Sequence, residues 1–130
     1  MIMGTVGNAG GQTSVTIIRG LSLDEIEFKD TFKIIWKEIR AGVIIGFTLA
    51  IANFIKLITI DHISVIISFV VCLTLLVTII IAKIVGCLLP LGAKKVGFDP
   101  AVMASPFITT ILDTLSLVIF FKIATIILHI

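Results

Sequence analysis

Apolar residues of this 130-residue chain gather into three long runs that are separated by short polar stretches. The runs cover residues 41–60, 63–82 and 99–130. Each is about 20 residues or longer, which lets a helix cross the roughly 30 Å hydrocarbon core of a bilayer. We therefore expect an all-α fold, a polytopic membrane helical bundle.

Small and helix-breaking residues within these runs predict where the helices pack closely and where they begin and end. The first run carries small residues at four-residue spacing, which suit close helix packing: Gly42, Gly46 and Ala50. The second run continues past Lys83, and three residues then predict its end: Pro90, Gly92 and Gly97. Asp99 and Pro100 predict the start of the last helix, as its N-cap and its first residue.

Residues 1–21 are less apolar than the three runs but still have a helical pattern. Small residues recur at helical spacing, at Gly4, Gly7, Gly11 and Ser14, and the amides of Asn8 and Gln12 share one face. Such a helix is poorly suited to face lipid, so we expect a fourth membrane helix inside the protein. Close packing of a neighbouring helix and lining of an ion path explain the glycines equally well.

The segment from Leu21 to Arg40 predicts an amphipathic helix. Ser22 and Glu25 match a capping box, and Leu21 with Ile26 matches a hydrophobic staple. Large apolar residues then share one stripe: Phe28, Phe32, Ile35, Trp36 and Ile39. The pattern indicates a helix on the membrane surface, with Trp36 among the lipid headgroups, although a solvated connector has the same pattern.

Composition supports membrane insertion and excludes several classes of function. The chain is 58% hydrophobic and 14% charged, with a mean hydropathy of +1.27. A net charge of +2 carries no sign of nucleic-acid binding. Cys72 and Cys87 lie in apolar runs without metal-ligand spacing, so we expect buried thiols. No catalytic constellation stands out, and we expect a single domain, residues 1–130, that is not an enzyme.

The basic residues predict an orientation in the membrane. Most of them lie in two segments, as Arg19, Lys29, Lys33, Lys37, Arg40, Lys94 and Lys95. The opposite side has little beyond Lys56 and Lys122. By the positive-inside rule, the loops 20–40 and 91–99 are cytoplasmic and both chain ends face outward. The expected location is the cell membrane, in contact with the lipid bilayer.

Asp113 is the strongest candidate for chemistry, because it lies well inside an apolar run. A carboxylate there costs about 2.5 to 3.5 kcal/mol unless something cationic or polar meets it. Hydroxyls and the acid share one helix face, at Ser105, Thr109, Asp113 and Ser116. Pro106 lacks an N–H and frees the carbonyl of Val102. We favour a cation path, while pairing of Asp113 with a lysine that only holds the bundle together is the alternative.

Three stretches of the chain resemble one family in the same order. They are GNAGGQTSVTIIRGL, LLPLGAKKVGFDPA and ASPFITTILDTLSLVIFF. They resemble the membrane domain of the MgtE family of magnesium channels and transporters, which is related to solute carrier family 41. The resemblance implies a homodimer around a central divalent-cation pore, with Asp113 as the ion-binding acid. It places Gly4, Gly7, Asn8, Ser105, Thr109 and Thr110 along or near the same path.

The chain departs from that family at several points. The first membrane helix, the cytoplasmic helical domain and the CBS-domain pair of the family have no counterpart in residues 1–130. A natural short form and a fragment of a longer protein are both compatible with this. Gly11, which we also place along the path, stands where some members carry a polar side chain, and Ser116 stands where glycine is common.

Physical chemistry is consistent with Mg²⁺ as the transported ion and requires no other cofactor. Mg²⁺ sheds water reluctantly and is commonly held by one or two carboxylates with several waters kept. A two-fold axis near Asp113 would bring two carboxylates together. Mn²⁺, Co²⁺ and Ca²⁺ satisfy the same pattern. Two other classes stay open: a proton-coupled carrier with Asp113 as the proton site, and a structural membrane subunit.

Overall fold

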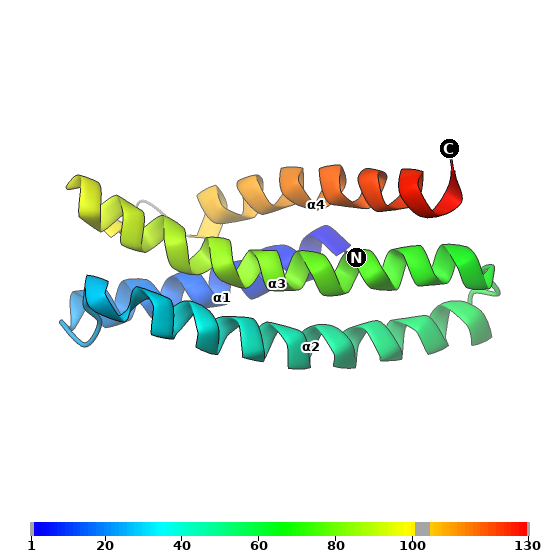
Figure 1. The fold of residues 1–130 in the computed structure, drawn as a ribbon, viewed down its shortest axis with the longest axis horizontal. Coiled ribbons are helices and arrows are strands. Elements are labelled where there is room, and N and C mark those ends of the chain that lie inside the picture. Colours follow the sequence, from blue (N-terminus) through cyan, green and yellow to red (C-terminus); the bar gives the residue numbers. More distant parts are fainter. Residues whose placement is uncertain (1, 101–104, 130) are drawn as a thin grey trace.

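The computed structural model describes residues 2–100 and 105–129, apart from the side chains of Ile2, Met3, Phe28 and Ser105. Four long helices make up most of this part of the chain: α1 (Ile2–Ser22), α2 (Thr31–Thr59), α3 (Val65–Val96) and α4 (Ser105–Leu128). A short 3-10 helix, η1 (Phe28–Asp30), precedes α2. Figure 1 shows them side by side as one elongated bundle. The predicted all-α membrane bundle is confirmed.

Three of these helices are long and apolar enough to span a membrane: α2, α3 and α4 from Pro106 onward. α1 is shorter and more polar, and it packs against α3 and α4. α2 packs mainly against α3, on the opposite side of the bundle from α4 (Figure 1). One side of the glycine-rich helix is therefore packed inside the bundle, as expected from its composition, while its other side, with Asn8 and Gln12, is exposed.

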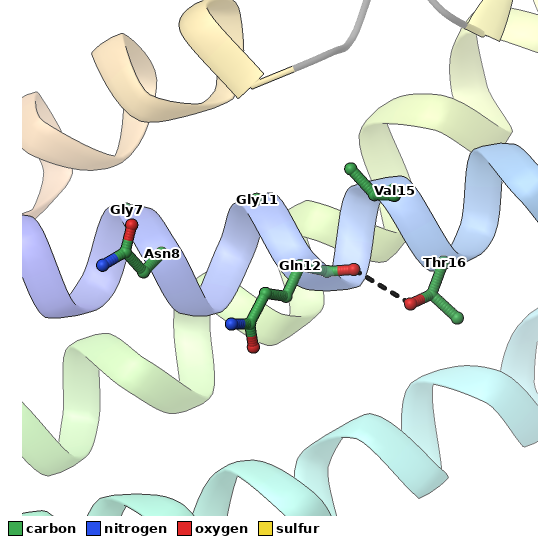
Figure 2. A pocket seen from close by; sticks show the side chains of 6 residues that line it. All are labelled: Gly7, Asn8, Gly11, Gln12, Val15 and Thr16. Carbon is green, nitrogen blue, oxygen red and sulfur yellow. Dashed lines mark hydrogen bonds between the residues drawn. The ribbon is translucent and has the colours of Figure 1, made fainter.

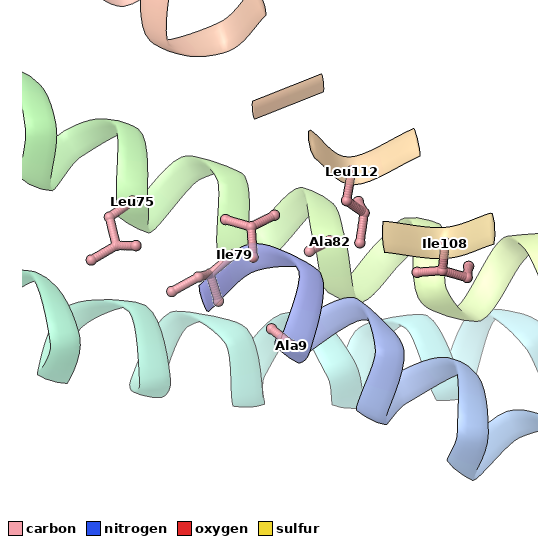
Figure 3. Packing of buried hydrophobic residues seen from close by; sticks show 7 residues of the cluster. Ala9, Leu75, Ile79, Ala82, Ile108 and Leu112 are labelled. Carbon is pink, nitrogen blue, oxygen red and sulfur yellow. The ribbon is translucent and has the colours of Figure 1, made fainter. Parts of the chain in front are cut away.

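Side chains from α1, α3 and α4 form the central core (Figure 3). It contains Val6, Ala9, Leu75, Ile79, Ala82, Ile108 and Leu112. Two glycines allow the helices to come this close. A β-carbon at Gly86 would lie 2.6 Å from the carbonyl oxygen of Gly10, and one at Gly10 would collide with the side chain of Leu112. The backbones of α1 and α3 thus meet where no side chain separates them.

The small residues predicted in α2 have the expected role. A β-carbon at Gly46 would lie 2.6 Å from Leu76 Cδ1, and one at Gly42 would lie 3.2 Å from Lys83 Cγ. Both glycines are buried against α3, whereas Ala50 is only half-buried. The prediction of close packing at Gly42 and Gly46 is confirmed.

The predicted helix break at Pro90 is wrong. α3 continues through Pro90 and ends at Gly97, which has a φ of 97° and donates its N–H to the carbonyls of Ala93 and Lys94. A proline removes one backbone donor, and membrane helices tolerate that loss where neighbouring elements surround the site. Pro90 is buried. The predicted 91–99 loop is therefore helical as far as Val96.

The predicted capping box at Ser22 is also wrong, because Ser22 is the last residue of α1. The N–H groups of Glu25 and Ile26 both donate to the carbonyl of Gly20 and close the helix end with a turn. Leu21 and Ile26 do belong to one apolar cluster, but they pack across this turn. The amphipathic residues 31–40 form the first turns of α2 and not a separate surface helix, since no breaker precedes residue 41.

The start of the last helix is described only in part. α4 is described from Ser105 onward, and residues 101–104, which link it to Pro100, lie outside the described residues. The carbonyl of Val102 lies there too, so its predicted role stays a prediction. Pro106 is the second described residue of α4, and the helix continues without interruption after it.

Candidate functional site

The contact between α1 and α4 brings together two predicted site residues from opposite ends of the chain. A β-carbon built on Gly7 would lie 3.9 Å from Asp113 Oδ1 and 3.2 Å from Thr109 Cγ2. Gly7 is buried, while Thr109 and Asp113 are half-buried. The bare backbone of α1 therefore lies directly against the acid and its neighbouring hydroxyl.

Asp113 has no charged partner in the described part of the chain. Ion pairs there include those of Lys29 with Glu27, Lys56 with Asp61 and Lys83 with Glu38, and none includes Asp113. An ionised carboxylate only accepts hydrogen bonds, and in an apolar surrounding it requires a cation, water or a donor. The lysine partner that a purely structural role would require is thus absent from the described residues.

Next to Gly7, the outer face of α1 carries an open pocket of about 440 Å³. Its lining comes from one face of α1: Gly7, Asn8, Gly11, Gln12, Val15 and Thr16 (Figure 2). The amides of Asn8 and Gln12 are exposed, and the Thr16 hydroxyl donates to the carbonyl of Gln12 at 3.0 Å. Amide oxygens are suitable acceptors for the waters of a hydrated cation.

The other predicted pore residues make contacts elsewhere, meet nothing within 4 Å, or are only partly described. Gly4 is exposed, and a β-carbon there would meet nothing within 4 Å. Thr110 is exposed and donates its hydroxyl to the carbonyl of Pro106 at 2.9 Å. Ser116 is buried and donates to the carbonyl of Leu112 at 2.7 Å. The side chain of Ser105 lies outside the described residues.

A buried polar cluster was missed at the sequence level. Lys83 Nζ of α3 lies 3.5 Å from Glu38 Oε2 of α2, and Thr13 Oγ1 of α1 lies 3.1 Å from the same oxygen. The Thr13 hydroxyl is equally close, at 3.1 Å, to the carbonyl of Ala9. The signal was an isolated lysine inside an apolar run, which calls for a partner of opposite charge.

The described residues contain no group of three or more His, Cys, Asp or Glu side chains that is placed to hold a metal ion. What one copy of the chain offers at the α1–α4 contact is one carboxylate with the Thr109 hydroxyl near it, while the amides of Asn8 and Gln12 line the adjoining pocket, which shares Gly7. This donor set suits an ion that keeps part of its hydration shell. It does not suit a resident metal centre of the zinc type, which needs four close ligands.

The sequence of the chain is similar to those of known proteins. Residues 1–123 match the MgtE family, described as a divalent cation transporter. The chain is 37% identical over 129 residues to the magnesium transporter MgtE of Bacillus subtilis and 34% identical over 125 residues to that of Enterococcus faecalis. It is 30% identical over 129 residues to the magnesium transporter MgtE of Thermus thermophilus.

These alignments cover nearly all of this chain but a small part of each relative. They include 99%, 96% and 99% of the chain, in the same order, and 28%, 27% and 28% of the relatives. The chain therefore spans little more than a quarter of the length of the curated relatives that it matches.

Proposed function

The chain belongs to the MgtE family of divalent cation transporters, and we propose that it forms a path for Mg²⁺ across the cell membrane. The path lies at the interface of a homodimer, and Asp113 of each copy is the acid that binds the ion. Residues 1–130 act as a single transmembrane domain. The proposed activity is transport, not catalysis, and the ion is the cargo.

The observation that carries this proposal is the contact of Asp113 with Gly7. The glycine places no side chain of α1 against the acid, because a β-carbon at this position would lie 3.2 Å from Thr109 Cγ2 and 3.9 Å from Asp113 Oδ1. A half-buried carboxylate without a basic partner among the described residues is available for a cation. This argues against a structural subunit, in which Asp113 would pair with a lysine, whereas a proton-coupled carrier is separated from an ion path by the uptake assay below.

A second copy of the chain supplies what one copy lacks. One carboxylate is a weak site for a divalent ion, and a two-fold axis beside Asp113 gives two facing acids. The exposed face of Asn8 and Gln12 is polar, which is unfavourable against lipid. A dimer whose axis runs along this face removes the amides from lipid and lines the path with Gly7, Asn8 and Gly11.

The ion keeps most of its waters in this proposal. The site offers two carboxylates per dimer and mainly neutral oxygens besides, too few hard ligands to replace the hydration shell of Mg²⁺. Thr109 and Thr110 then contribute oxygens that accept hydrogen bonds from the waters, and the predicted role of Ser105 falls on a side chain outside the described residues. Gly4 lies further along the same helix, towards one mouth of the path.

The proposed orientation places the basic end of the bundle in the cytoplasm. The α1–α2 connection and the C-terminal end of α3 lie at the same end (Figure 1), which agrees with the positive-inside assignment for both segments. The two predicted loops, 20–40 and 91–99, are shorter in the structure. They begin at residues 23 and 97, and the first ends at residue 30, because the rest of each predicted loop belongs to α1, α2 or α3. Lys94 and Lys95 stand in the last turn of α3.

Uptake by liposomes that contain only this chain tests the proposed function. A fluorescent Mg²⁺ indicator inside the liposomes is expected to report an influx that empty liposomes lack. The influx should follow the membrane potential and should not require a pH gradient, which separates a channel for Mg²⁺ from a proton-coupled carrier. Influx that depends on a pH gradient alone would assign Asp113 to proton transfer instead.

A further inference from the structure

The first turns of α2 carry a basic and aromatic face that the proposed ion path does not use. Phe32, Lys33, Trp36, Lys37 and Arg40 recur at positions that share one side of a helix. We refer to these five residues as the basic face. All five are exposed, with 82% of Phe32 and 55% of Trp36 accessible.

The charges of the basic face are not neutralised within the described part of the chain. Lys33, Lys37 and Arg40 form no ion pair there, whereas Lys29 is paired with Glu27 at 3.0 Å. Glu38 points to the other side of α2, where it is buried against Lys83. Asp30, the residue before α2, is the next acid on the N-terminal side, and its Oδ2 accepts a hydrogen bond from the N–H of Glu27. Three cations therefore project together from the end of a membrane helix.

An apolar groove continues the same side of α2 towards the middle of the bundle. It has a volume of about 440 Å³ and is lined by apolar side chains of α2 and α3, among them Phe47, Ile51, Phe54, Phe69, Leu73 and Leu76. Position 47 follows Arg40 by two helical turns, and position 51 follows it by three. The groove therefore begins roughly 10 Å along the helix from the basic face and lies beneath it.

We propose that the basic face and this groove together bind one anionic phospholipid. The phosphate headgroup contacts the ammonium groups of Lys33 and Lys37 and the guanidinium of Arg40, and one acyl chain lies in the groove between α2 and α3. A phospholipid matches this arrangement, because its charged headgroup and its apolar acyl chain follow one another as the basic face and the groove do along α2. The indole of Trp36 lies at the headgroup level, where tryptophan is most stable in a bilayer.

Two ligands could bind the basic face, a lipid or an acidic protein segment, and the apolar groove favours the lipid. Both would satisfy the three cations, but an acidic peptide brings nothing to fill an apolar groove within the membrane-spanning part of α2. Juxtamembrane basic residues attract anionic lipid surfaces through charge and then bind phosphate through hydrogen bonds. Exposed aromatic side chains beside the cations anchor the same interface. The lipid fits the charges and the groove at once.

Fluorescence of Trp36, the single tryptophan of the chain, tests the proposal without any transport measurement. The purified chain is placed in bilayers that contain phosphatidylglycerol or phosphatidylcholine brominated in the upper acyl chain, because bromine quenches a nearby indole. Brominated phosphatidylglycerol is expected to quench Trp36 at a lower mole fraction than brominated phosphatidylcholine. Each basic residue is expected to contribute about fivefold to this preference at low ionic strength.

Two matched sets of charge variants and one groove variant assign the preference to the site. Lys33→Gln, Lys37→Gln and Arg40→Gln together should abolish the preference for phosphatidylglycerol. Lys94→Gln with Lys95→Gln removes two exposed cations at the same end of the bundle but away from the groove, and should preserve it. Ala50→Phe places a ring in the groove and should weaken quenching by both lipids, while a phosphatidylglycerol preference remains.

Three outcomes overturn the proposal. Equal quenching by the two lipids in the unmodified chain rules out an anionic site. An unchanged preference in the triple glutamine variant places the lipid elsewhere. Displacement of brominated phosphatidylglycerol by a soluble acidic peptide at low concentration assigns the face to a protein partner. None of these outcomes depends on Asp113 or on the uptake assay, so the proposed Mg²⁺ path is tested independently of the lipid site.

Discussion

Lys83 of α3 and Glu38 of α2 form an ion pair inside the bundle, with Nζ 3.5 Å from Oε2. Their side chains are only 9% and 15% exposed, and the carboxylate also accepts a hydrogen bond from Thr13 of α1. Gly42 makes the approach possible, because a β-carbon there would lie 3.2 Å from Lys83 Cγ. Three helices are therefore joined at one polar cluster.

Removal of one member of this pair should cost more stability than removal of both. Glu38→Gln leaves a buried lysine unpaired, and the expected loss is about 3 to 5 kcal/mol. The double variant Glu38→Gln with Lys83→Met buries no charge and should recover most of that loss. Thermal unfolding of the detergent-solubilised protein measures both. A double variant as unstable as Glu38→Gln would show that the pair itself is not the cause.

Asp113→Asn should abolish Mg²⁺ uptake while leaving the fold intact. The amide has nearly the same shape, but it lacks the charge that offsets partial dehydration of the ion, and a neutral side chain is cheaper to bury in a membrane. Asp113→Ala should behave alike. The control is Asp61→Asn, which alters an exposed acid paired with Lys56 at the α2–α3 turn and should leave uptake unchanged. Normal uptake by the Asn variant would show that Asp113 is not the ion site.

Substitution of single glycines by alanine should separate the ion path from the helix packing. Gly10→Ala collides with Leu112 and should destabilise the bundle. Gly7→Ala needs only a small shift of Thr109, so it should reduce uptake with little loss of stability. Gly92→Ala meets nothing within 4 Å and should stabilise α3 by roughly 0.5 to 1 kcal/mol without changing uptake. Equal uptake by the Gly7 and Gly92 variants would remove Gly7 from the path.

The purified protein should be a homodimer in detergent. The polar face of Asn8 and Gln12 has no partner helix among the described residues, and a second copy covers it. Light scattering or native mass spectrometry gives the mass of the assembly. A monomer that still supports uptake would contradict a path shared between two copies.

Cobalt hexammine should block Mg²⁺ uptake if the ion is held through its waters. This complex resembles hydrated Mg²⁺ but does not exchange its ligands, so it competes only at a site built for a hydrated ion. A site that removes the water ligands of the ion should instead not bind the complex, and it should bind Mn²⁺ at least as well as Mg²⁺. Titration of the complex against uptake distinguishes the two, and lack of inhibition far above the Mg²⁺ concentration would exclude the hydrated form.

Much of the fold could be predicted because the lengths of the apolar runs and the spacing of small residues are local properties. Gly42 and Gly46 were assigned to helix packing from their spacing alone, and they do contact α3. Asp113 and the glycine helix were both selected as site elements, because an acid in an apolar run and a helix without side chains are unusual in a membrane. The structure adds that these two elements contact one another, with Gly7 of α1 against Thr109 and Asp113 of α4.

The sequence by itself thus determined the fold class, the apolar spans and which residues were candidates for chemistry, since hydrophobic length and the cost of a buried charge act along the chain. Only the tertiary structure decided how α3 passes Pro90, that α2 begins at Thr31, and that Glu38 pairs with Lys83. A proline or a capping motif states a local preference, and packing of neighbouring helices can outweigh it. Partners such as Glu38 and Lys83 lie far apart in the chain, so they meet only once α2 and α3 are packed.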